Sequence, residues 1–421
     1  MLVKFAVSNF LSFKERVEFS LEKVSKSQQH KKSVIDGLLR SACIYGANNS
    51  GKTNLLKAVR FLSRVVNKGS VSAEYKPYYT FIPNTDNNSK FEIWFKKNEK
   101  IYNYILECGV DGVSSEELYV GKKLIFKRTK DDVEKLTDYG VLEGIPFYIN
   151  RRFKKDSLFL TKLFEDNIFE ESDLKYKNYF EDVFEWFSGL FCIQLNASVT
   201  GTGFCLYLEK EVEFKEYLQN LLQQIDSNIL SIDWQKLPDD VAKSQFELIS
   251  SRIRDDKPTG NFFIRRGYDF IIFTKSENSV EAKKLYTYHN NERFEVNWES
   301  DGTKKIIELA LAFYFLNVAD VTVFIDELDA SLHPIFVRKI INSFMESKTR
   351  SQLIFTSHNI PLLTHEIWRV DQIWFVEKVA DGSSRLYSLQ QFAPRFDKNI
   401  SKDYLMGKYG AIPIGDRNWK W

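Results

Sequence analysis

The segment GANNSGKT at residues 46–53 has the residue types and the spacing of a phosphate-binding loop. It matches the pattern GxxxxGK[ST] in full. Glycines let backbone N–H groups surround phosphate oxygens, and a following helix adds the positive end of its dipole. In such a loop Lys52 reaches the β- and γ-phosphates, and the Thr53 hydroxyl binds Mg²⁺. The residues expected to contact a nucleotide are Gly46, Asn48, Asn49, Ser50, Gly51, Lys52, Thr53 and Asn54.

Two acidic residues follow a second apolar run, VTVFIDEL at 321–328. The run predicts a buried strand that carries Asp326 and Glu327 to its C-terminal end, the edge where open α/β sheets bind ligands. Asp326 would hold Mg²⁺ through water, and Glu327 would act as general base on the attacking water. The competing interpretation of this common pattern is a strand that ends in a solvated turn.

Four further residues lie at predicted element ends. His358 in QLIFTSHN follows a buried strand, where an imidazole can bond a γ-phosphate or the attacking water, or can be structural. Ser300 and Gly302 in ESDGTKK open a predicted helix, either as a plain N-terminal cap or as an anion site. His333 in SLHP is equally compatible with starting a helix and with contacting a nucleotide.

The elements that must position these residues alternate between strands and helices. Residues 41–46 form a short buried strand before the loop, and residues 53–66 have helical spacing and stop before Gly69. The last part of the chain continues the alternation, with helices predicted at 303–319 and 334–347 and strands predicted at 321–326 and 352–358. This pattern predicts an α/β sheet.

Other segments favour antiparallel strands or helices. Residues 2–10 and 15–24 predict two strands joined by a turn, and residues 91–128 alternate as an antiparallel sheet. Residues 372–389 predict a hairpin. Residues 150–298 have a more helical and more variable pattern, with one amphipathic helix at 239–256.

The motif order makes the chain resemble a known family. GANNSGKT, ESDGT, FIDELDASLHP and FTSHN follow the order of an ABC-type ATPase head of the SMC/RecF/OLD-like branch. The resemblance implies that Ser300 and Gly302 cap the γ-phosphate of ATP bound by a second subunit, and that Asp329 lies at the dimer interface. It also implies that Asn9 and Ser12 of VSNFLSF lie near the nucleotide.

The C-terminal segments RVDQIWFVEK, SRLYSLQQF and YLMGKYGAIP narrow the resemblance. They are similar to short AAA-type ATPases described as "ATP/GTP phosphatases", which occur in bacterial anti-phage, restriction-associated and toxin–antitoxin-like loci. ATPase subunits of the PARIS and Septu defence systems are of this kind. The chain departs from the family pattern at two points. Its signature is ESDGT rather than LSGGQ, and Gln194 is a weak candidate for the Q-loop glutamine.

Together these patterns predict an α/β P-loop NTPase with an ABC-ATPase head, in which a mixed sheet core is joined by an antiparallel β lobe and a largely helical insert. The expected segments follow the motif order. Residues 1–130 form the N-terminal lobe, 131–298 form a mostly helical insert that binds partners, and 299–421 form the C-terminal lobe.

The resemblance implies an ATPase with ATP and Mg²⁺ as cofactors, working as an ATP-sandwiched homodimer or higher oligomer. We expect a sensor or scaffold switch in a bacterial anti-phage system that controls a separate effector protein such as a nuclease, because no nuclease-like histidine cluster is present. The alternative is a DNA-repair ATPase of the RecF/SMC type that binds nucleic acid directly. The basic clusters at 150–155 and 263–267 would then contact DNA; otherwise they are ordinary solvated loops.

Composition narrows the function classes less than the motifs do. Of the 421 residues, 43% are hydrophobic, which favours a globular chain with a sizeable core. The net charge of +2 neither requires nor excludes nucleic acid. The four cysteines show no metal-binding spacing and are expected to be reduced and structural. We expect no membrane span, no signal peptide and a cytoplasmic location.

Overall fold

The computed structural model describes residues 1–24, 30–72, 74–76, 79–81, 88–129, 133–134, 154–165, 174–193, 201–250, 259–290, 292–395 and 398–413. The chain divides into two compact units. The first combines Met1–Cys192, Ala319–Leu328 and Ile341–Trp421, and the second combines Ile193–Val318 and Asp329–Ile340. The segments 131–298 and 299–421 that we predicted from the motif order therefore each contribute to both units.

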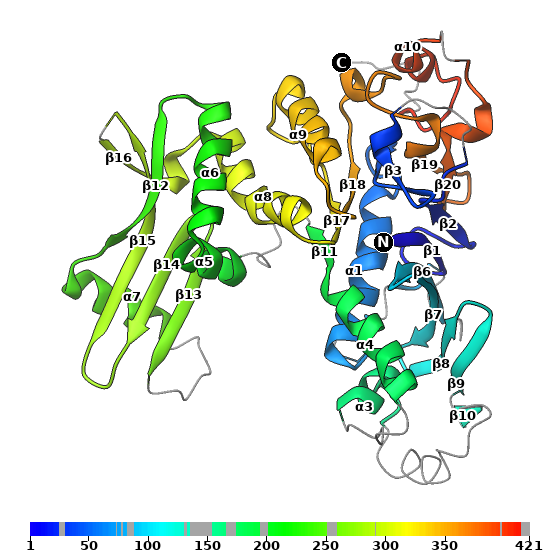
Figure 1. Cartoon of the computed structure of the whole chain (residues 1–421), viewed down its shortest axis with the longest axis horizontal. Helices are drawn as coiled ribbons and strands as arrows, with labels where there is room; N and C mark the ends of the chain where they lie inside the picture. The colour runs from blue at the N-terminus through cyan, green and yellow to red at the C-terminus, as the bar shows by residue number, and fades with distance from the viewer. Residues whose placement is uncertain are drawn as a thin grey trace. The chain divides into compact units, whose positions relative to one another are not determined.

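A mixed sheet forms the centre of the first unit (Figure 1). Its described strands lie in the order β11-β17-β18-β5-β19-β20. Strands β17, β18, β5 and β19 are parallel, and β20 pairs with β19 in the antiparallel direction. The bounds are β11 Leu190–Ile193, β17 Thr322–Ile325, β18 Gln352–Thr356, β5 Ser41–Tyr45, β19 Ile373–Lys378 and β20 Ser384–Ser388. Every residue of β5, β17 and β18 is buried, as expected for parallel strands covered on both faces.

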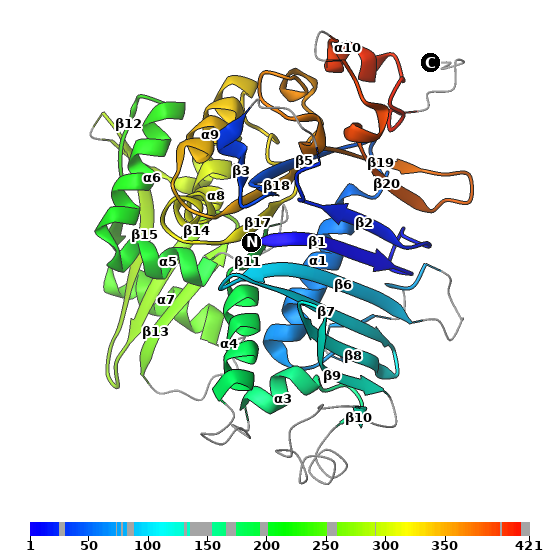
Figure 2. The ribbon, with the colours of Figure 1, turned by 45° about the vertical axis from the view of Figure 1, so that its right-hand side comes forward.

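An antiparallel sheet forms the second layer of this unit, and its strands fan out side by side in Figure 2. In the described part of the chain the order is β10-β9-β8-β7-β6-β1-β2. The bounds are β1 Leu2–Ser8, β2 Val17–Ser20, β6 Ser89–Lys97, β7 Lys100–Gly109, β8 Gly112–Val120, β9 Lys123–Thr129 and β10 Val133–Glu134. Buried and partly exposed residues alternate along β6, which confirms the predicted period of two.

Helix α1 (Lys52–Lys68) shares one hydrophobic core with both sheets. Its buried positions include Leu55, Leu62 and Val66. Helices α3 (Phe159–Glu165) and α4 (Leu174–Ser188) contact α1, and α4 adds Phe180 to the same core. Helix α1 ends at Gly69, which has a positive φ of 68°, as the sequence predicted.

The sequence analysis predicts an antiparallel sheet at residues 91–128 but does not identify strand β8 within it. Its polar residues hide the alternation, since Glu116 takes a buried position. This fully buried carboxylate accepts hydrogen bonds from the backbone N–H groups of Phe159 and Leu160 at 2.7 and 3.0 Å, and from the Tyr104 hydroxyl at 3.0 Å. Glu116 therefore ties the start of α3 to the sheet. Its burial raises its pKa.

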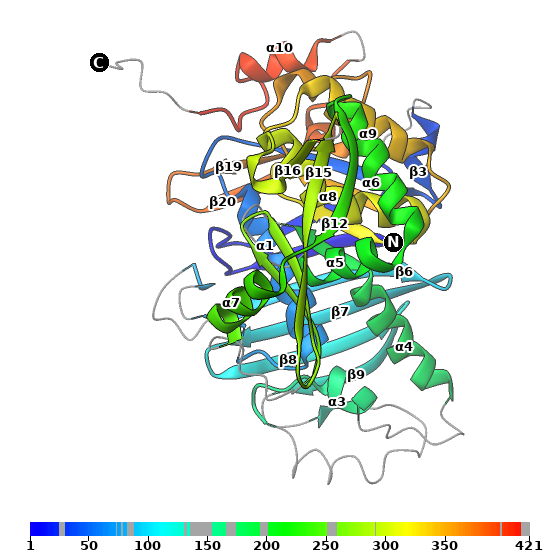
Figure 3. The ribbon, with the colours of Figure 1, turned by 90° about the vertical axis from the view of Figure 1, so that its left-hand side faces the viewer.

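The second unit is built on an antiparallel sheet (Figure 3). The described strands lie in the order β12-β15-β14-β13, and β16 pairs with β15. Helix α7 covers the face that carries Ile271 and Phe273, while Phe270 on the other face lies 5.0 Å from Phe204 of α5. The strand bounds are β12 Ile229–Lys236, β13 Gly260–Arg266, β14 Asp269–Lys275, β15 Val280–His289 and β16 Glu292–Glu295, and the helix bounds are α5 Gly201–Lys210, α6 Val212–Ile225, α7 Asp239–Ser250 and α8 Asp301–Val318.

The prediction of a largely helical segment at 131–298 needs correction. Helices α3 to α7 do lie there, but so does the whole sheet of the second unit. The strands were missed because charged residues interrupt their apolar runs. Strand β15 reads VEAKKLYTYH, and its two lysines obscure the alternation of the pleat.

Helix α9 and the cysteines agree with the sequence analysis, which made no prediction for α10, β3 or β4. Helix α9 spans Pro334–Glu346, helix α10 spans Ile400–Leu405, and β3 (Val34–Ile35) pairs with β4 (Leu38–Leu39). All four cysteines are free thiols, as predicted. Among the residues that the structure describes, none of the helices has the length and apolar character needed to cross a bilayer.

Candidate nucleotide-binding site

The loop at residues 46–51 joins buried strand β5 to the start of α1. Helix α1 begins at Lys52, and its N-cap residue Gly51 has a φ of 114°. A helix start leaves backbone N–H groups without partners inside the helix. Because glycine has no side chain that could cap them, these groups remain suited to phosphate oxygens.

Close packing also requires glycine at two positions of the loop. A Cβ atom added to Gly46 would collide with the carbonyl oxygen of Val376 and lie 2.7 Å from the Ser50 hydroxyl. A Cβ atom added to Gly51 would collide with the Ser384 hydroxyl and lie 2.7 Å from the Ser12 hydroxyl. The loop is therefore pressed against neighbouring segments, and both glycines serve this approach as well as the phosphate geometry.

Lys52 extends back over the loop. Its ammonium group donates hydrogen bonds to the carbonyl oxygens of Gly46 at 2.8 Å and Ala47 at 3.0 Å. The side chain thus lies within the curve that the loop makes. The Ser50 hydroxyl is buried and has no hydrogen-bond partner among the described residues. An unsatisfied buried hydroxyl beside a buried cation fits a ligand with anionic oxygens.

Two serines from distant parts of the sequence hold the loop in place. The Asn54 amide donates to the Ser12 hydroxyl at 2.9 Å, and the backbone N–H of Ser384 donates to the carbonyl oxygen of Ser12 at 2.6 Å. The Ser384 hydroxyl donates to the carbonyl oxygen of Ser50 at 2.5 Å. Ser12 therefore lies against the loop. Sequence reasoning missed Ser384, which has no local signal because its partner is 334 residues away.

Asn9 stabilises the segment that carries Ser12. Its side-chain oxygen accepts from the backbone N–H of Phe81 at 3.1 Å, and its amide donates to the carbonyl oxygen of Asn88 at 3.4 Å. Asn9 also has a positive φ of 48°, a conformation that asparagine tolerates well. At the tip of the loop, Asn48 and Asn49 are exposed, and Asn49 has a φ of 61°.

The two predicted carboxylates follow strand β17 directly. Asp326 is buried, and its carboxylate accepts a hydrogen bond from the Thr356 hydroxyl at 2.7 Å. The oxygen of the same hydroxyl accepts from the backbone N–H of Glu327, also at 2.7 Å. Glu327 is partly exposed and has a φ of 49°, which is uncommon outside glycine and asparagine. Thr356 therefore fixes both acidic residues, and the sequence analysis overlooked it although it lies in the quoted FTSHN motif.

Register brings these residues to the same edge of the sheet as the loop. Strand β18 lies between β17 and β5, with Ile325 beside Phe355 and Phe355 beside Cys43. The strands are parallel, so Asp326, His358 and the residues after Tyr45 all follow C-terminal strand ends. His358 is exposed at the end of β18. The geometry thus gathers the acidic residues and His358 at the edge where the 46–51 loop begins.

The signature residues open helix α8 in the second unit. The Ser300 hydroxyl accepts from the backbone N–H of Thr303 at 3.1 Å, so Ser300 is the N-terminal cap, and it is exposed. A Cβ atom on Gly302 would lie 3.0 Å from the carbonyl oxygen of Ser331. Gly302 therefore allows the backbone of the segment that follows Asp329 to approach the helix. Ser331 has a positive φ of 63°.

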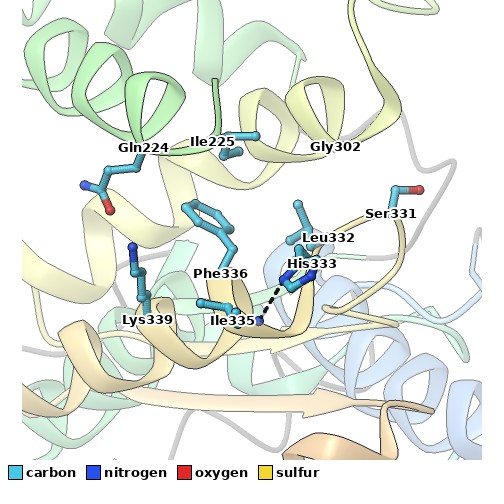
Figure 4. A pocket seen from close by; sticks show the side chains of 9 residues that line it. All are labelled: Gln224, Ile225, Gly302, Ser331, Leu332, His333, Ile335, Phe336 and Lys339. Carbon is cyan, nitrogen blue, oxygen red and sulfur yellow. Dashed lines mark hydrogen bonds between the residues drawn. The ribbon is translucent and has the colours of Figure 1, made fainter. Parts of the chain in front are cut away.

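A cavity of about 240 Å³ lies beside Gly302 in the second unit (Figure 4). Its lining comes from the end of α6, the start of α8, the residues around Ser331 and the start of α9. His333 contributes to this lining, and its Nδ1 accepts from the backbone N–H of Ile335 at 3.3 Å. This contact at the start of α9 favours the interpretation of His333 as a residue that starts a helix.

A second pair of residues that the sequence analysis missed anchors the segment before Ser300. The Glu299 carboxylate lies 2.7 Å from Nε2 of His289 at the end of β15, and the Thr287 hydroxyl donates to the same carboxylate. These contacts tie the start of α8 to strand β15. Neither His289 nor Thr287 belongs to a motif, so only the fold reveals them.

The structure describes the basic cluster at 263–267, but it does not describe most of the cluster at 150–155 or the Q-loop candidate. Arg265 of the 263–267 cluster donates to the buried Glu308 carboxylate at 3.2 Å and to the Gly267 carbonyl oxygen at 2.8 Å, so it is engaged within the unit. Residues 150–153 of the other cluster, and Gln194, lie outside the described residues.

The site combines a buried strand, a glycine-rich loop that ends at a lysine, and acidic residues two strands away in the sheet. This combination defines a nucleotide-binding protein with the P-loop NTPase fold. The model of the family described as "AAA domain, putative AbiEii toxin, Type IV TA system" matches residues 41–162 and 204–364. This match covers about two thirds of the chain and includes GANNSGKT, ESDGT, FIDELDASLHP and FTSHN. The chain belongs to this family of AAA-type ATPases.

Three solved structures are similar to the chain at low sequence identity. The SMC head domain from Thermotoga maritima is similar at 12% identity and a TM-score of 0.41, over 92% of this chain and 98% of that one. An SmcHead bound to the C-winged helix domain of ScpA gives 14% identity and a TM-score of 0.42, over 93% and 99% of the two chains. An Smc head domain bound to the C-terminal domain of ScpA, derived from Pyrococcus furiosus, gives 14% and 0.41, over 93% and 97%. No curated protein matches the chain.

Proposed function

We propose that this protein hydrolyses ATP and works as an ATP-dependent switch in a bacterial anti-phage defence system, where it controls a separate effector protein. The observation that carries the ATPase part is the edge of the mixed sheet, where Thr356 holds Asp326 and Glu327 beside the strand that leads into the 46–51 loop. The family match, whose description names a toxin–antitoxin type, supports the defence role.

The residues of the loop would hold the phosphates. Gly46 and Gly51 let the loop pack closely against Val376 and Ser384, and the buried Ser50 hydroxyl offers a donor to a phosphate oxygen. The Lys52 ammonium already lies inside the loop, where its bonds to carbonyl oxygens can exchange for bonds to the β- and γ-phosphates. The first turn of α1 adds its N–H groups and its dipole.

Thr53 and Asp326 are the residues that would hold Mg²⁺. When bound, the ion neutralises charge that develops on the transferred phosphoryl group. Asp326 is kept in one orientation by Thr356, which leaves its other carboxylate oxygen for the water shell of the ion. Glu327 is the candidate general base, and His358 would bond the γ-phosphate or the attacking water. His358 follows the intervening strand β18, which ends at Thr356, and this position at the sheet edge supports the role.

The switch would operate through a nucleotide-linked pair of chains. Ser300 and Gly302 cap the γ-phosphate bound by a second copy in this proposal, and Asp329 faces the same interface. The exposed helix start at Ser300 is compatible with this role. ATP closes the pair and hydrolysis opens it, so the output is a conformational state rather than a product. An effector such as a nuclease would respond to that state.

The proposal is tested by expressing tagged Glu327→Gln protein with its neighbouring genes and measuring its native mass in ATP and Mg²⁺. The expected particle contains at least two copies of this chain and a second polypeptide. A particle of this chain alone that binds DNA in a salt-dependent manner would contradict effector control and favour the DNA-repair alternative.

A further inference from the structure

The segment at residues 296–300, which leads into helix α8, is held from several sides. Val296 is buried. The Asn297 side-chain oxygen accepts from the backbone N–H of Tyr268 at 2.9 Å. The Glu299 carboxylate is bonded by His289, and Ser300 caps α8. The backbone of this segment is therefore fixed on the second unit both before and after residue 298.

Trp298 is the exception within this anchored segment, because 73% of its side chain is exposed. Tryptophan is a large apolar residue. Trp298 lies at the end of a 3-10 turn, and its neighbours Asn297 and Glu299 form hydrogen bonds with other residues of the second unit. Exposed tryptophans of this kind are enriched among the residues that dominate protein–protein binding energies. The rigid backbone also lowers the entropic cost of using the side chain as a contact.

We infer that Trp298 is a contact residue of the ATP-bound dimer and packs against a second copy of this chain. The inference rests on the proposed function, in which Ser300 reaches the nucleotide of that copy. Two residues span at most about 7 Å, so a surface that comes within hydrogen-bond distance of Ser300 also lies close to the exposed Trp298. The partner surface is therefore the region of the second copy that surrounds its bound nucleotide.

The test uses Glu327→Gln protein, in which hydrolysis is stalled, and measures the dimer dissociation constant by sedimentation velocity in ATP and Mg²⁺. Adding Trp298→Ala is expected to weaken the dimer by about tenfold or more, the loss typical of a buried aromatic anchor. Trp298→Glu is expected to weaken it further, because it places a charge in the contact. Leu248→Ala is the matched control, since Leu248 of the same unit is 72% exposed and lies in α7.

Nucleotide binding by single chains, measured with a fluorescent ATP analogue, and the unfolding midpoint should not change in any of these variants. If both Trp298 variants dimerise as tightly as the Leu248 control, the inference is wrong while the proposed dimer stands. If Glu327→Gln protein binds ATP but never dimerises, the proposed switch fails and the inference fails with it. A Trp298→Ala variant that loses affinity for a single-stranded DNA oligonucleotide, with its dimer constant unchanged, would assign the tryptophan to nucleic acid instead.

Discussion

The Thr356 hydroxyl donates a hydrogen bond to the Asp326 carboxylate at 2.7 Å and accepts one from the backbone of Glu327 at the same distance. One side chain on β18 therefore sets the position of both acidic residues that follow β17. Since β18 also pairs with β5, the same strand relates these residues to the 46–51 loop.

Thr356→Val should lower ATP turnover by about tenfold or more while nucleotide affinity stays within a small factor. The substitution keeps the volume but releases Asp326 and Glu327, the proposed metal ligand and the proposed general base. Phosphate release and binding of a fluorescent ATP analogue measure the two effects. Thr356→Ser keeps the hydroxyl and is the control. Equal turnover in the valine variant and the wild type would show that the carboxylates are positioned without this bond.

Gly51→Ala should destabilise the fold by at least about 2 kcal/mol, since it combines an unfavourable φ with collisions against Ser12 and Ser384. Gly121→Ala is the matched control, because Gly121 has a φ of 60° and no described atom within 4 Å of an added Cβ. Its cost should be limited to the backbone conformation, about 1–2 kcal/mol. Denaturant unfolding compares the two. Equal losses of stability would mean that Ser12 and Ser384 move aside at little cost when a Cβ atom is added to Gly51.

Mixing two inactive variants should restore part of the ATPase activity. Lys52→Ala removes the phosphate contact of its own loop, and Ser300→Asp places a negative charge where the proposed dimer brings the γ-phosphate of the second copy. Aspartate is as good an N-terminal cap as serine, so α8 should remain stable. A mixed dimer contains one site with an intact Lys52 and an intact Ser300. Activity that stays at the level of the separate variants would argue that Ser300 does not act on the second copy.

The buried Glu116 predicts how the free energy of unfolding depends on pH. Its folded-state pKa is raised by burial, so its contribution to stability is fully present below the unfolded pKa of about 4.3 and is lost as pH rises through the folded pKa. Glu116→Gln removes this titration. The free energy of unfolding of the variant relative to the wild type should therefore increase between about pH 4 and pH 7. Denaturant titrations at several pH values measure it, and a constant difference would show that Glu116 does not titrate in this range.

Much of the site could be predicted from local sequence because its parts are motifs at element ends. The loop at 46–53 lies between a strand and a helix, and Asp326 and Glu327 follow a buried strand, as predicted. These features depend on apolar runs and glycine spacing, which a single sequence records. His358 also lies at the predicted strand end.

The supporting residues could not be predicted, because their partners are remote in sequence. Ser384 contacts Ser50 across 334 residues, and the Glu299 anchor depends on the hairpin of β15 and β16. Strand β8 and the sheet of the second unit were missed for a different reason. Buried or paired charges such as Glu116 interrupt the apolar alternation on which strand prediction depends.

The contacts of Ser12 and Ser384 with the 46–51 loop have a consequence for biosynthesis. The loop is translated long before the strand that carries Ser384, because Ser50 and Ser384 are 334 residues apart. Strands β17 and β18 must also be complete before the parallel sheet can close around β5. A growing chain therefore carries the phosphate-binding motif long before it has the support that shapes it, and contacts so distant in sequence form slowly. We therefore expect a chain to bind nucleotide only after residue 388, the end of β20, has been made.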